Sequence, residues 1–502
     1  MTTTDVRSAD PKLERHRLYV DGEFVDAEDR GTFTSIDPYQ GKEWAELALA
    51  RSEDVDLAVA AARKALKDDA WTSLTGVQRG RLLRKLAKAV RENADELATI
   101  EVRDNGKLYR EMHAQMMGLI PEYFEYFAGS ADRLSGAVIP TGKSDYLVYS
   151  VREPIGVVGA ITAWNSPTLL MAYKLAPALA AGCTFVLKPP DVAPVSALAF
   201  ARITEQVGIP PGVFNVVTGD GETGAALASH PGVDKIAFTG SPGVGKLIAN
   251  AAADHLTPAV LELGGKSAQV VFPDSDLEAV TNGVVAGIFA AGGQTCVAGS
   301  RLIVHEHVHD ELVERVVERA ERIALGDPMA PDTEMGPLAF RNHFDRVLGF
   351  VDSAIADGAT VATGGRRSPS FGDGLFVEPT VFTDATPDMK IFREEVFGPI
   401  LVVMRFTDEA QAVELTNASD YGLAASVWTN DIRRAHRIAH SLAVGTVWIN
   451  SYRVVAAEVP FGGVGISGYG REGGVEGLSE YLRAKSIWVE LSGKTRDPFQ
   501  IG

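Results

Sequence analysis

Short apolar runs alternate with amphipathic stretches along most of this 502-residue chain. In a first block, the runs that predict strands are residues 157–160, 184–187, 213–217 and 235–238. The stretches with helical spacing lie between and after these runs, at residues 171–181, 196–206, 224–229 and 243–253. Strands that alternate with helices form βαβ units, so we expect a parallel sheet with helices on both faces.

A second block with the same alternation follows the first. Its predicted strands are residues 268–271, 301–305, 375–382, 400–405, 426–429 and 446–449. Its predicted helices are residues 310–322, 341–357, 408–418 and 432–441. Upstream of both blocks, the pattern favours a strand region at residues 18–24 and helices at residues 52–67 and 77–105. Residues 146–152 alternate in the manner of a ribbon strand.

Composition and charge narrow the class of protein. Hydrophobic residues make up 46% of the chain and charged residues 23%, as in ordinary globular proteins. The 48 basic and 66 acidic residues give a net charge of −18, which argues against a nucleic-acid binder because such proteins carry a basic face. Lys174, Pro177 and Lys188 interrupt the apolar stretches, so no membrane span is expected. Residues 1–17 lack the apolar core of a secretory signal, which favours a cytoplasmic protein.

The chain has two cysteines, Cys183 and Cys296. Without a Cys-x-x-Cys pair they form neither a redox dithiol nor a cysteine-rich zinc site, and a reducing compartment is favoured. Cys183 opens an apolar run and reads as a buried core thiol. Cys296 is flanked by small residues in Gly-Gly-Gln-Thr-Cys-Val-Ala-Gly, which suits a thiol that a substrate can approach. A core position for Cys296 remains the alternative.

A carboxylate and two strand-end side chains are further candidates for chemistry. Glu262 lies between two leucines and before Gly-Gly, so partial burial would raise its pKa toward that of a general base. The alternative is a buried acid paired with Lys266. Asn165 and Lys188 follow successive predicted strands, and ligands of parallel sheets bind at such carboxyl ends. Asn165 could donate to an oxyanion, or be a turn residue before Pro167; Lys188 could instead be solvated.

Two glycine-rich segments are candidate phosphate loops. Residues 219–224 fit Gly-x-Gly-x-x-Gly after a predicted strand, but without the acidic residue that closes a dinucleotide fingerprint, so a plain turn is favoured. Residues 240–246 fit Gly-x-x-x-x-Gly-Lys, but Leu247 replaces the Ser or Thr that holds magnesium. A P-loop nucleotide-binding module is therefore not favoured, while a phosphate cradle at a helix start remains open.

Taken together, these motifs resemble the aldehyde dehydrogenase superfamily over residues 19 to 489. The strongest matches are Leu-Glu-Leu-Gly-Gly-Lys-Ser at 261–267 and Gly-Gln-Thr-Cys at 293–296. Supporting matches are Trp-Asn-Ser-Pro at 164–167, Leu-Lys-Pro at 187–189, Phe-Thr-Gly-Ser at 238–241, Glu-Glu-Val-Phe-Gly-Pro at 394–399 and Pro-Phe-Gly-Gly at 460–463, followed by 467–472.

The resemblance implies an α/β fold with a Rossmann-type parallel-sheet cofactor domain, an α/β catalytic domain and a small β bridging ribbon. On the family pattern, the dinucleotide-binding domain spans residues 1–131 and 155–264. The catalytic domain spans residues 265–466, and the bridging, oligomerisation segment spans residues 132–154 and 467–502. The expected assembly is a homodimer or a homotetramer. No metal is implied.

The resemblance also assigns catalytic roles. Cys296 would attack the aldehyde to form a thiohemiacetal, Asn165 and the Cys296 backbone N–H would hold the oxyanion, and Glu262 would activate water to hydrolyse the thioester. A CoA-acylating relative, in which the thioester passes to CoA, is the alternative that Glu262 disfavours. A non-catalytic relative is disfavoured by the presence of Cys296, Glu262 and Asn165.

The cofactor and substrate sites follow from the same resemblance. NAD is expected in preference to NADP, because the carboxylate of Asp191 would accept from ribose hydroxyls and repel a 2′-phosphate. His343 stands where a glutamine often reaches the cofactor. The expected cofactor-binding residues are Ile161, Thr162, Trp164, Lys188, Asp191, Gly221, Phe238, Thr239, Gly240, Ser241, Leu263, Glu395 and Phe397. The expected substrate-contacting residues are Trp164, Ser166, Thr295, Val297, Arg453 and Phe461, of which Arg453 could pair with an anionic aldehyde or serve structure only.

Overall fold

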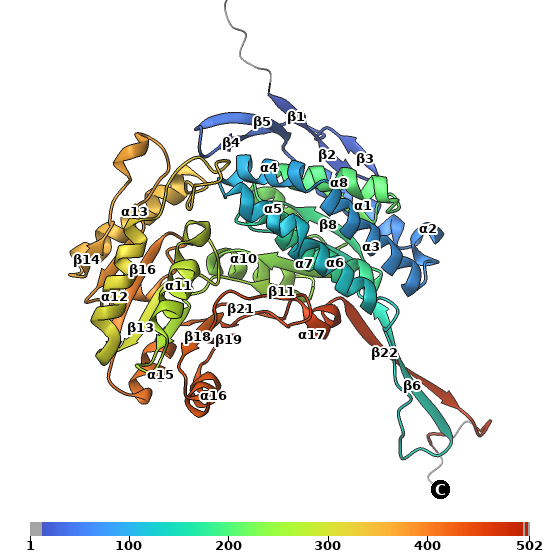
Figure 1. Cartoon of the computed structure of the whole chain (residues 1–502). Coiled ribbons are helices and arrows are strands. Elements are labelled where there is room, and N and C mark those ends of the chain that lie inside the picture. The colour runs from blue at the N-terminus through green and yellow to red at the C-terminus, as the bar shows by residue number, and fades with distance from the viewer. Residues whose placement is uncertain (1–12, 495–496, 500–502) are drawn as a thin grey trace, which may run out of the picture.

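Two α/β halves lie side by side in the computed structural model of the chain, and a two-stranded ribbon projects from them (Figure 1). The structure describes residues 13–494 and 497–499. The prediction that no secretory signal is present falls largely on residues 1–12, outside the described part. None of the described helices is both long and apolar enough to cross a membrane.

The first half is built on an eight-stranded sheet in the order β21-β11-β10-β7-β8-β9-β2-β3. Its parallel core consists of β7 (Val157–Ile161), β8 (Thr184–Lys188), β9 (Phe214–Val216), β10 (Lys235–Thr239) and β11 (Ala259–Glu262). The antiparallel edges are β2 (Leu18–Val20), β3 (Glu23–Val25) and β21 (Gly468–Tyr469). The chain leaves β7 toward β8 on one side and returns to β10 on the other. Ligands of such sheets bind at this reversal, beyond the carboxyl ends of β7 and β10.

Helices cover both faces of the first sheet, each over its own hydrophobic core. One layer holds α3 (Gly76–Glu92), α4 (Ala94–Asn105), α5 (Tyr109–Met117), α6 (Leu119–Ser130), α7 (Pro167–Ala181) and α8 (Val195–Val207). The other holds α1 (Ser52–Ala65), α9 (Gly221–Ala228) and α10 (Pro242–Ala253). The prediction of one helix over residues 77–105 was wrong, because the chain breaks at Asn93 and starts α4 there.

The second half is a seven-stranded sheet in the order β14-β15-β16-β13-β12-β18-β19. Its strands are β12 (Ala268–Val271), β13 (Arg301–His305), β14 (Thr360–Thr363), β15 (Thr380–Thr383), β16 (Ile400–Phe406), β18 (Ala424–Trp428) and β19 (Thr446–Ile449), all parallel except β14. The strand expected at residues 375–382 starts only at Thr380, since Pro379 has no N–H to donate to a ladder. The helices are α11 (Leu277–Ile288), α12 (Glu306–Glu321), α13 (Arg341–Ala356), α15 (Glu409–Asn417) and α16 (Ile432–Ser441).

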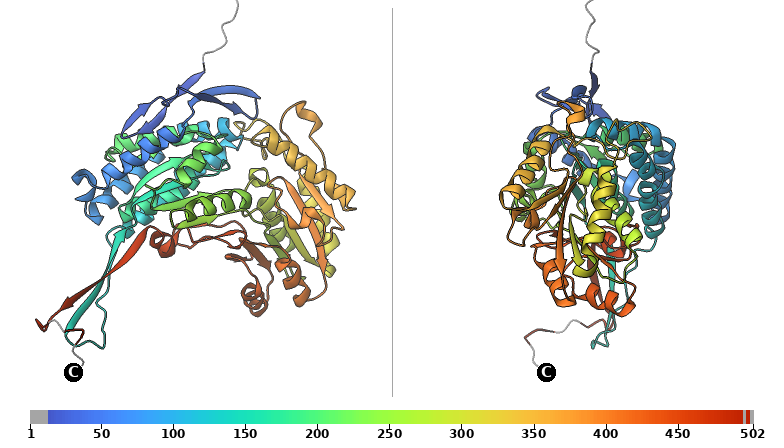
Figure 2. Two further views of the ribbon diagram at one scale, coloured as in Figure 1. Left: turned by 180° about the vertical axis from the view of Figure 1, so that it is seen from behind. Right: turned by 60° about the vertical axis from the view of Figure 1, so that its left-hand side comes forward.

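The ribbon pairs β6 (Tyr146–Pro154) with β22 (Leu482–Glu490) in antiparallel register and extends away from both halves in every view (Figures 1 and 2). Before it reaches the ribbon, the C-terminal chain adds β21 to the first sheet and packs α17 (Gly474–Ser479) near α7. The division into domains with separate roles stays a prediction, and its outer bounds 1 and 502 lie outside the described residues.

Smaller elements complete the chain. The strand region expected at residues 18–24 is a hairpin of β2 and β3, which turns at Asp21 and Gly22. A three-stranded sheet joins β1 (Glu14–His16), β5 (Lys42–Ala48) and β4 (Thr32–Asp37). The other short elements are α2 (Asp69–Thr72), α14 (Lys390–Arg393), β17 (Tyr421–Gly422), β20 (Val464–Gly465) and the 3₁₀ turns Ala290–Gly293 and Pro369–Phe371.

Candidate active site

Two cavities meet beyond the carboxyl ends of β7 and β10, at the reversal of the first sheet. One has a volume of about 500 Å³ and the other of about 480 Å³. The residues that line both are Asn165, Leu170, Thr239, Leu263 and Cys296. A group bound in either cavity therefore reaches the same thiol and the same amide.

Cys296 follows the 3₁₀ turn Ala290–Gly293 and keeps partial exposure to the cavities. The turn needs left-handed backbone at Gly292 and Gly293, which explains its small residues. A β-carbon on Gly265 would lie 2.5 Å from the backbone oxygen of Cys296, so glycine there lets the two strongest motifs touch. Burial, followed by the negative charges of Glu395 and Glu262, raises the pKa of Cys296 to about 12. The resting thiol is protonated and needs a base.

Glu262 ends β11 and faces the 480 Å³ cavity with 4% of its surface exposed. Neither carboxylate oxygen has a hydrogen-bond partner among the described residues. Burial first, and then the charge of Glu472, raise the pKa of Glu262 well above its usual value. The alternative pairing with Lys266 is not formed, because the Lys266 ammonium also lacks a partner in the described chain. Glu262 is therefore a buried carboxyl group with a raised pKa that opens onto the cavity.

Asn165 follows β7 and is 7% exposed. Its Nδ2 donates to the backbone carbonyl of Gln294 at 3.1 Å, which ties the amide to the loop that carries Cys296. The Gln294 side chain in turn accepts from the Ala339 N–H at 3.0 Å. An amide nitrogen carries two N–H groups, so the second can serve an oxygen bound next to the thiol.

The 500 Å³ cavity has an aromatic wall and one carboxylate. Trp164 lies with its ring centroid 5.3 Å from Phe397 and 5.1 Å from His343. Glu395 Oε1 accepts from the Gly265 N–H at 2.9 Å, and burial raises the pKa of Glu395 to about 7. Gly264 allows this approach, since a β-carbon there would lie 2.2 Å from Glu395 Oε2. Flat rings and a hydrogen-bond acceptor at a sheet reversal suit a nucleoside.

His343 lines the same cavity but its ring is already engaged. Its Nε2 lies 2.8 Å from the Phe397 carbonyl, which makes that nitrogen the N–H donor. Burial lowers the pKa of His343 to about 4, so the imidazole is neutral. The ring supports the left-handed backbone of Phe397, whose φ is 62°.

The structure separates the predicted cofactor residues into two groups. Those that line the 500 Å³ cavity are Trp164, Thr239, Gly240, Ser241, Leu263, Glu395 and Phe397. Those outside its wall are Ile161, Thr162, Lys188, Asp191, Gly221 and Phe238. At the start of α9, Asp220 accepts from the Glu222 N–H at 2.9 Å and pairs with Arg51 at 3.1 Å. The Asp220 carboxylate thus caps the first N–H groups of α9, so residues 219–224 form a capped turn.

The predicted substrate residues Ser166, Thr295, Val297, Arg453 and Phe461 all line the 480 Å³ cavity, together with Glu262. Trp164 lies in the wall of the other cavity. Cys183 is fully buried and donates to the Tyr481 carbonyl, as expected of a core thiol.

Comparison with known proteins decides the family. Residues 24–487 match the model of the aldehyde dehydrogenase family. The chain belongs to the aldehyde dehydrogenase family. The predictions of this family, of its α/β fold and of an NAD-dependent enzyme that oxidises aldehydes are thereby confirmed.

Relatives and solved structures match nearly the whole length of this aldehyde dehydrogenase. The (Z)-2-((N-methylformamido)methylene)-5-hydroxybutyrolactone dehydrogenase of Acinetobacter baylyi is 43% identical over 490 residues, 97% of this chain and 99% of the relative. An aldehyde dehydrogenase of Bacillus cereus, solved as an NAD⁺ complex, is 42% identical with a TM-score of 0.94 and covers 95% of this chain and 97% of its own. A betaine aldehyde dehydrogenase of Staphylococcus aureus, solved with NAD⁺, is 39% identical with a TM-score of 0.95 and covers 98% and 97%.

Sequence reasoning missed a buried ion pair beside Glu262 in this aldehyde dehydrogenase. Lys174 of α7 is fully buried, pairs with Glu472 and donates to Thr239 Oγ1 at 2.7 Å. The signal was present, because Lys174 is the one charged residue in the otherwise uncharged helix α7 and a buried lysine needs a partner. The partner could not be found from sequence, since it lies 298 residues away.

The wall of the substrate-side cavity formed by α5 was also missed. Glu111 and Gln115 lie one turn apart on α5 and line the cavity, together with Lys107 before this helix and Leu119 at the start of α6. The helix itself was not predicted. Arg346 was missed on the other side, where it lines the 500 Å³ cavity and donates to the Glu395 carbonyl at 2.7 Å.

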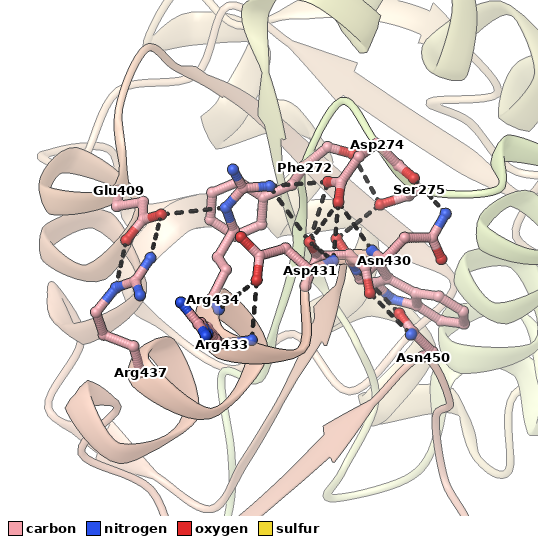
Figure 3. Close-up of polar contacts among 12 residues, drawn as sticks. Phe272, Asp274, Ser275, Glu409, Asn430, Asp431, Arg433, Arg434, Arg437 and Asn450 are labelled. Carbon is pink, nitrogen blue, oxygen red and sulfur yellow. Dashed lines mark hydrogen bonds and ion pairs between the residues drawn. The ribbon is translucent and has the colours of Figure 1, made fainter.

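The loop that carries Arg453 begins in a polar network at the carboxyl edge of the second sheet (Figure 3). Asp274 accepts from the Asn430 N–H at 3.0 Å and pairs with Arg434 at 2.9 Å. Asn450 Oδ1 accepts from the Thr429 N–H at 2.9 Å, and its amide returns to the Thr429 carbonyl at 2.9 Å. These bonds fix the point from which residues 450–463 run back over the substrate-side cavity.

Proposed function

We propose that the chain oxidises an aldehyde to a carboxylic acid with Cys296 as the nucleophile, Asn165 as the oxyanion donor and Glu262 as the base for hydrolysis. The observation that carries this proposal is the position of Cys296 and Asn165 in the walls of both cavities. A hydride donor held on one side and a hydride acceptor held on the other would meet at this thiol.

The chemistry uses each side chain in turn. The Cys296 thiol loses its proton to solvent water, its sulfur adds to the aldehyde carbon, and the carbonyl oxygen becomes an oxyanion held by Asn165 Nδ2 and the Cys296 N–H. The chemistry that bound NAD⁺ supplies is acceptance of the hydride from that carbon, which leaves a thioester on Cys296. Glu262 then takes a proton from water, the hydroxide adds to the thioester, and the carbon–sulfur bond breaks to release the acid. Transfer to CoA is disfavoured because a buried base stands beside the thioester.

The residues present fit NAD. Gly240 and Ser241 at the N-terminus of α10 would hold the pyrophosphate, and Glu395 and Phe397 would hold the nicotinamide ribose and ring. Lys188, buried at the end of β8, and the exposed Asp191 would bind the adenosine ribose. The Asp191 carboxylate would repel a 2′-phosphate, so NAD is preferred over NADP.

We further propose a homodimer or homotetramer in the cytoplasm. The ribbon leaves apolar side chains exposed, among them Trp488 at 54% and Leu147 at 41%. A two-stranded ribbon is marginal alone, so a second copy would cover it. A reducing compartment would keep Cys296 from oxidation.

A screen of NADH release over aliphatic, aromatic, amino- and carboxy-aldehydes tests the proposed function. We expect acid formation without CoA, a higher kcat/KM with NAD than with NADP, and no turnover by Cys296→Ala. Activity that survives Cys296→Ala would overturn the role of this thiol. Equal or reversed cofactor preference would overturn the role of Asp191.

A further inference from the structure

We propose that the preferred substrates are aldehydes that carry a carboxylate at the end remote from the aldehyde, and that Lys107 and Arg453 bind this carboxylate. The inference rests on the proposed function, since it assigns the class of substrate to the same site. It uses two cationic side chains on the wall of the substrate-side cavity, one supplied by the segment before α5 and one by the loop after β19.

Lys107 is a buried cation with little to bind in the protein. It is 5% exposed and lines the cavity just before α5. An ammonium has three donors. The one hydrogen bond of its Nζ within the described chain is a long contact of 3.4 Å to Ser166 Oγ, whose own proton goes to the Asn165 carbonyl at 2.7 Å. Burial of a lysine without a counter-ion carries a desolvation free energy, which a bound anion would offset at Lys107.

Arg453 lines the same cavity from the loop after β19. Its Nη1 donates to the Ala286 carbonyl at 3.0 Å and to the Ala290 carbonyl at 3.4 Å, at the end of α11. These contacts hold the guanidinium in place and use one of its nitrogen atoms, so further donors remain for a ligand. Arg453 thus has a structural contact and keeps donors for a ligand. The charges that act on Lys107 are the negative charges of Glu111 and Glu101 and the positive charge of Arg453.

The acidic groups near the cavity leave donors of Lys107 and Arg453 free. Glu472 is bound to Lys174. The negative charge of Glu111 acts on Lys107 more strongly than the positive charge of Arg453 does, but Glu111 is partly exposed. The hydrogen bonds of the two cations within the described chain go to Ser166, Ala286 and Ala290 instead. Both cations therefore keep donors for a ligand, which favours an anionic group and opposes a cationic one.

Much of the remaining cavity wall is apolar. Its lining includes Leu119, Leu169, Leu170, Tyr173, Val297 and Phe461. A hydrocarbon spacer between aldehyde and carboxylate would pack on these side chains, with the aldehyde at Cys296 and the carboxylate at Lys107 and Arg453. The class is therefore an ω-oxo carboxylic acid.

The test compares kcat/KM for 4-oxobutanoate, 5-oxopentanoate and 6-oxohexanoate with that for each methyl ester, which has the same spacer without the charge. We expect at least one acid to exceed its ester about tenfold or more. Lys107→Met should lower the acid-to-ester ratio about 10- to 100-fold, the amount typical of a hydrogen bond to a charged group. Lys107→Arg should restore most of the ratio.

Lys85→Met on the exposed face of α3 is the matched control and should leave the ratio at the wild-type value. Glu111→Gln removes the neighbouring negative charge and should not lower the ratio. The inference would be overturned if kcat/KM for the esters or for betaine aldehyde equalled that for every acid. It would also be overturned if Lys107→Met left the acid-to-ester ratio unchanged. If no aldehyde of any charge is oxidised, the proposed function itself fails, which is a different result.

Discussion

The surroundings of Glu262 favour the protonated form of this base. Burial, and then the charge of Glu472, raise the pKa of Glu262 well above its usual value. The base form is more abundant at higher pH and is lost as the pH falls through the raised pKa. Hydrolysis of the thioester should therefore accelerate with rising pH over a range above that of an ordinary glutamate.

Substitution of this side chain should separate the two chemical stages. Glu262→Gln should keep formation of the thioester but slow its hydrolysis about 10²- to 10⁴-fold, the usual contribution of a general base. Stopped-flow measurement should then show a burst of NADH equal to the enzyme concentration, followed by slow turnover without the rise with pH. Cys296→Ala is the control and should show no burst. A variant with no burst but full steady-state turnover would contradict the assignment.

The residues at the centre of the site could be predicted because each belongs to a local motif. Cys296, Glu262 and Asn165 stand among small residues or at strand ends, and these patterns are legible in sequence. Lys107 and Glu472 carry no such signature. Their role depends on partners and cavity walls supplied by distant segments, which only the folded chain brings together.

Loops at the carboxyl ends of strands supply most of the site. Side-chain hydrogen bonds, rather than strand pairing, hold the points at which these loops leave the sheet. Asp274 shows this most clearly, because it accepts from the N–H groups of Asn430 and Asp431 and also binds Thr429 and Arg434. The cluster in Figure 3 thus holds the start of the loop that carries Arg453.

Asp274→Ala should therefore affect both stability and substrate binding. Loss of these charge-assisted bonds should lower the free energy of unfolding by about 2 kcal/mol. The start of the loop that carries Arg453 would no longer be held in place, so substrate binding should weaken and KM should rise more than kcat falls. Urea denaturation and steady-state kinetics measure the two effects. Asp352→Ala, on the exposed face of α13, is the control; identical behaviour of the two variants would refute the role of Asp274.

At the level of elements, the alternating pattern predicted both sheets well because strands buried on both faces are continuous apolar runs. The errors in the predicted elements concern where helices end and which helices were missed. Asn93 ends one helix and starts the next without a proline or glycine to mark the break. The helices α5 and α6 were missed because their buried positions include Met, Pro and Tyr in place of a regular aliphatic stripe.

On the scale of the whole molecule, the ribbon should control assembly. Trp488 packs against Tyr146 with a ring separation of 5.9 Å, and both remain exposed. Trp488→Glu should place a charge in the proposed contact and reduce the mass found by light scattering to that of a smaller species. Met329→Glu, exposed on the other half, should keep the wild-type mass. A wild-type monomer at micromolar concentration would contradict the proposed assembly.

The path of the C-terminal chain also sets an order for biosynthesis. Residues of the first half have their partners in the last part of the chain. Lys174 forms an ion pair with Glu472, Lys235 forms one with Glu480, and β11 pairs with the strand that contains Tyr469. When the ribosome has synthesised β11, the first half still lacks β21 and contains Lys174 and Lys235 without their acidic partners. Its final packing must wait until the second half has been synthesised, so a nascent chain stopped before residue 470 should depend on chaperones and be open to proteases.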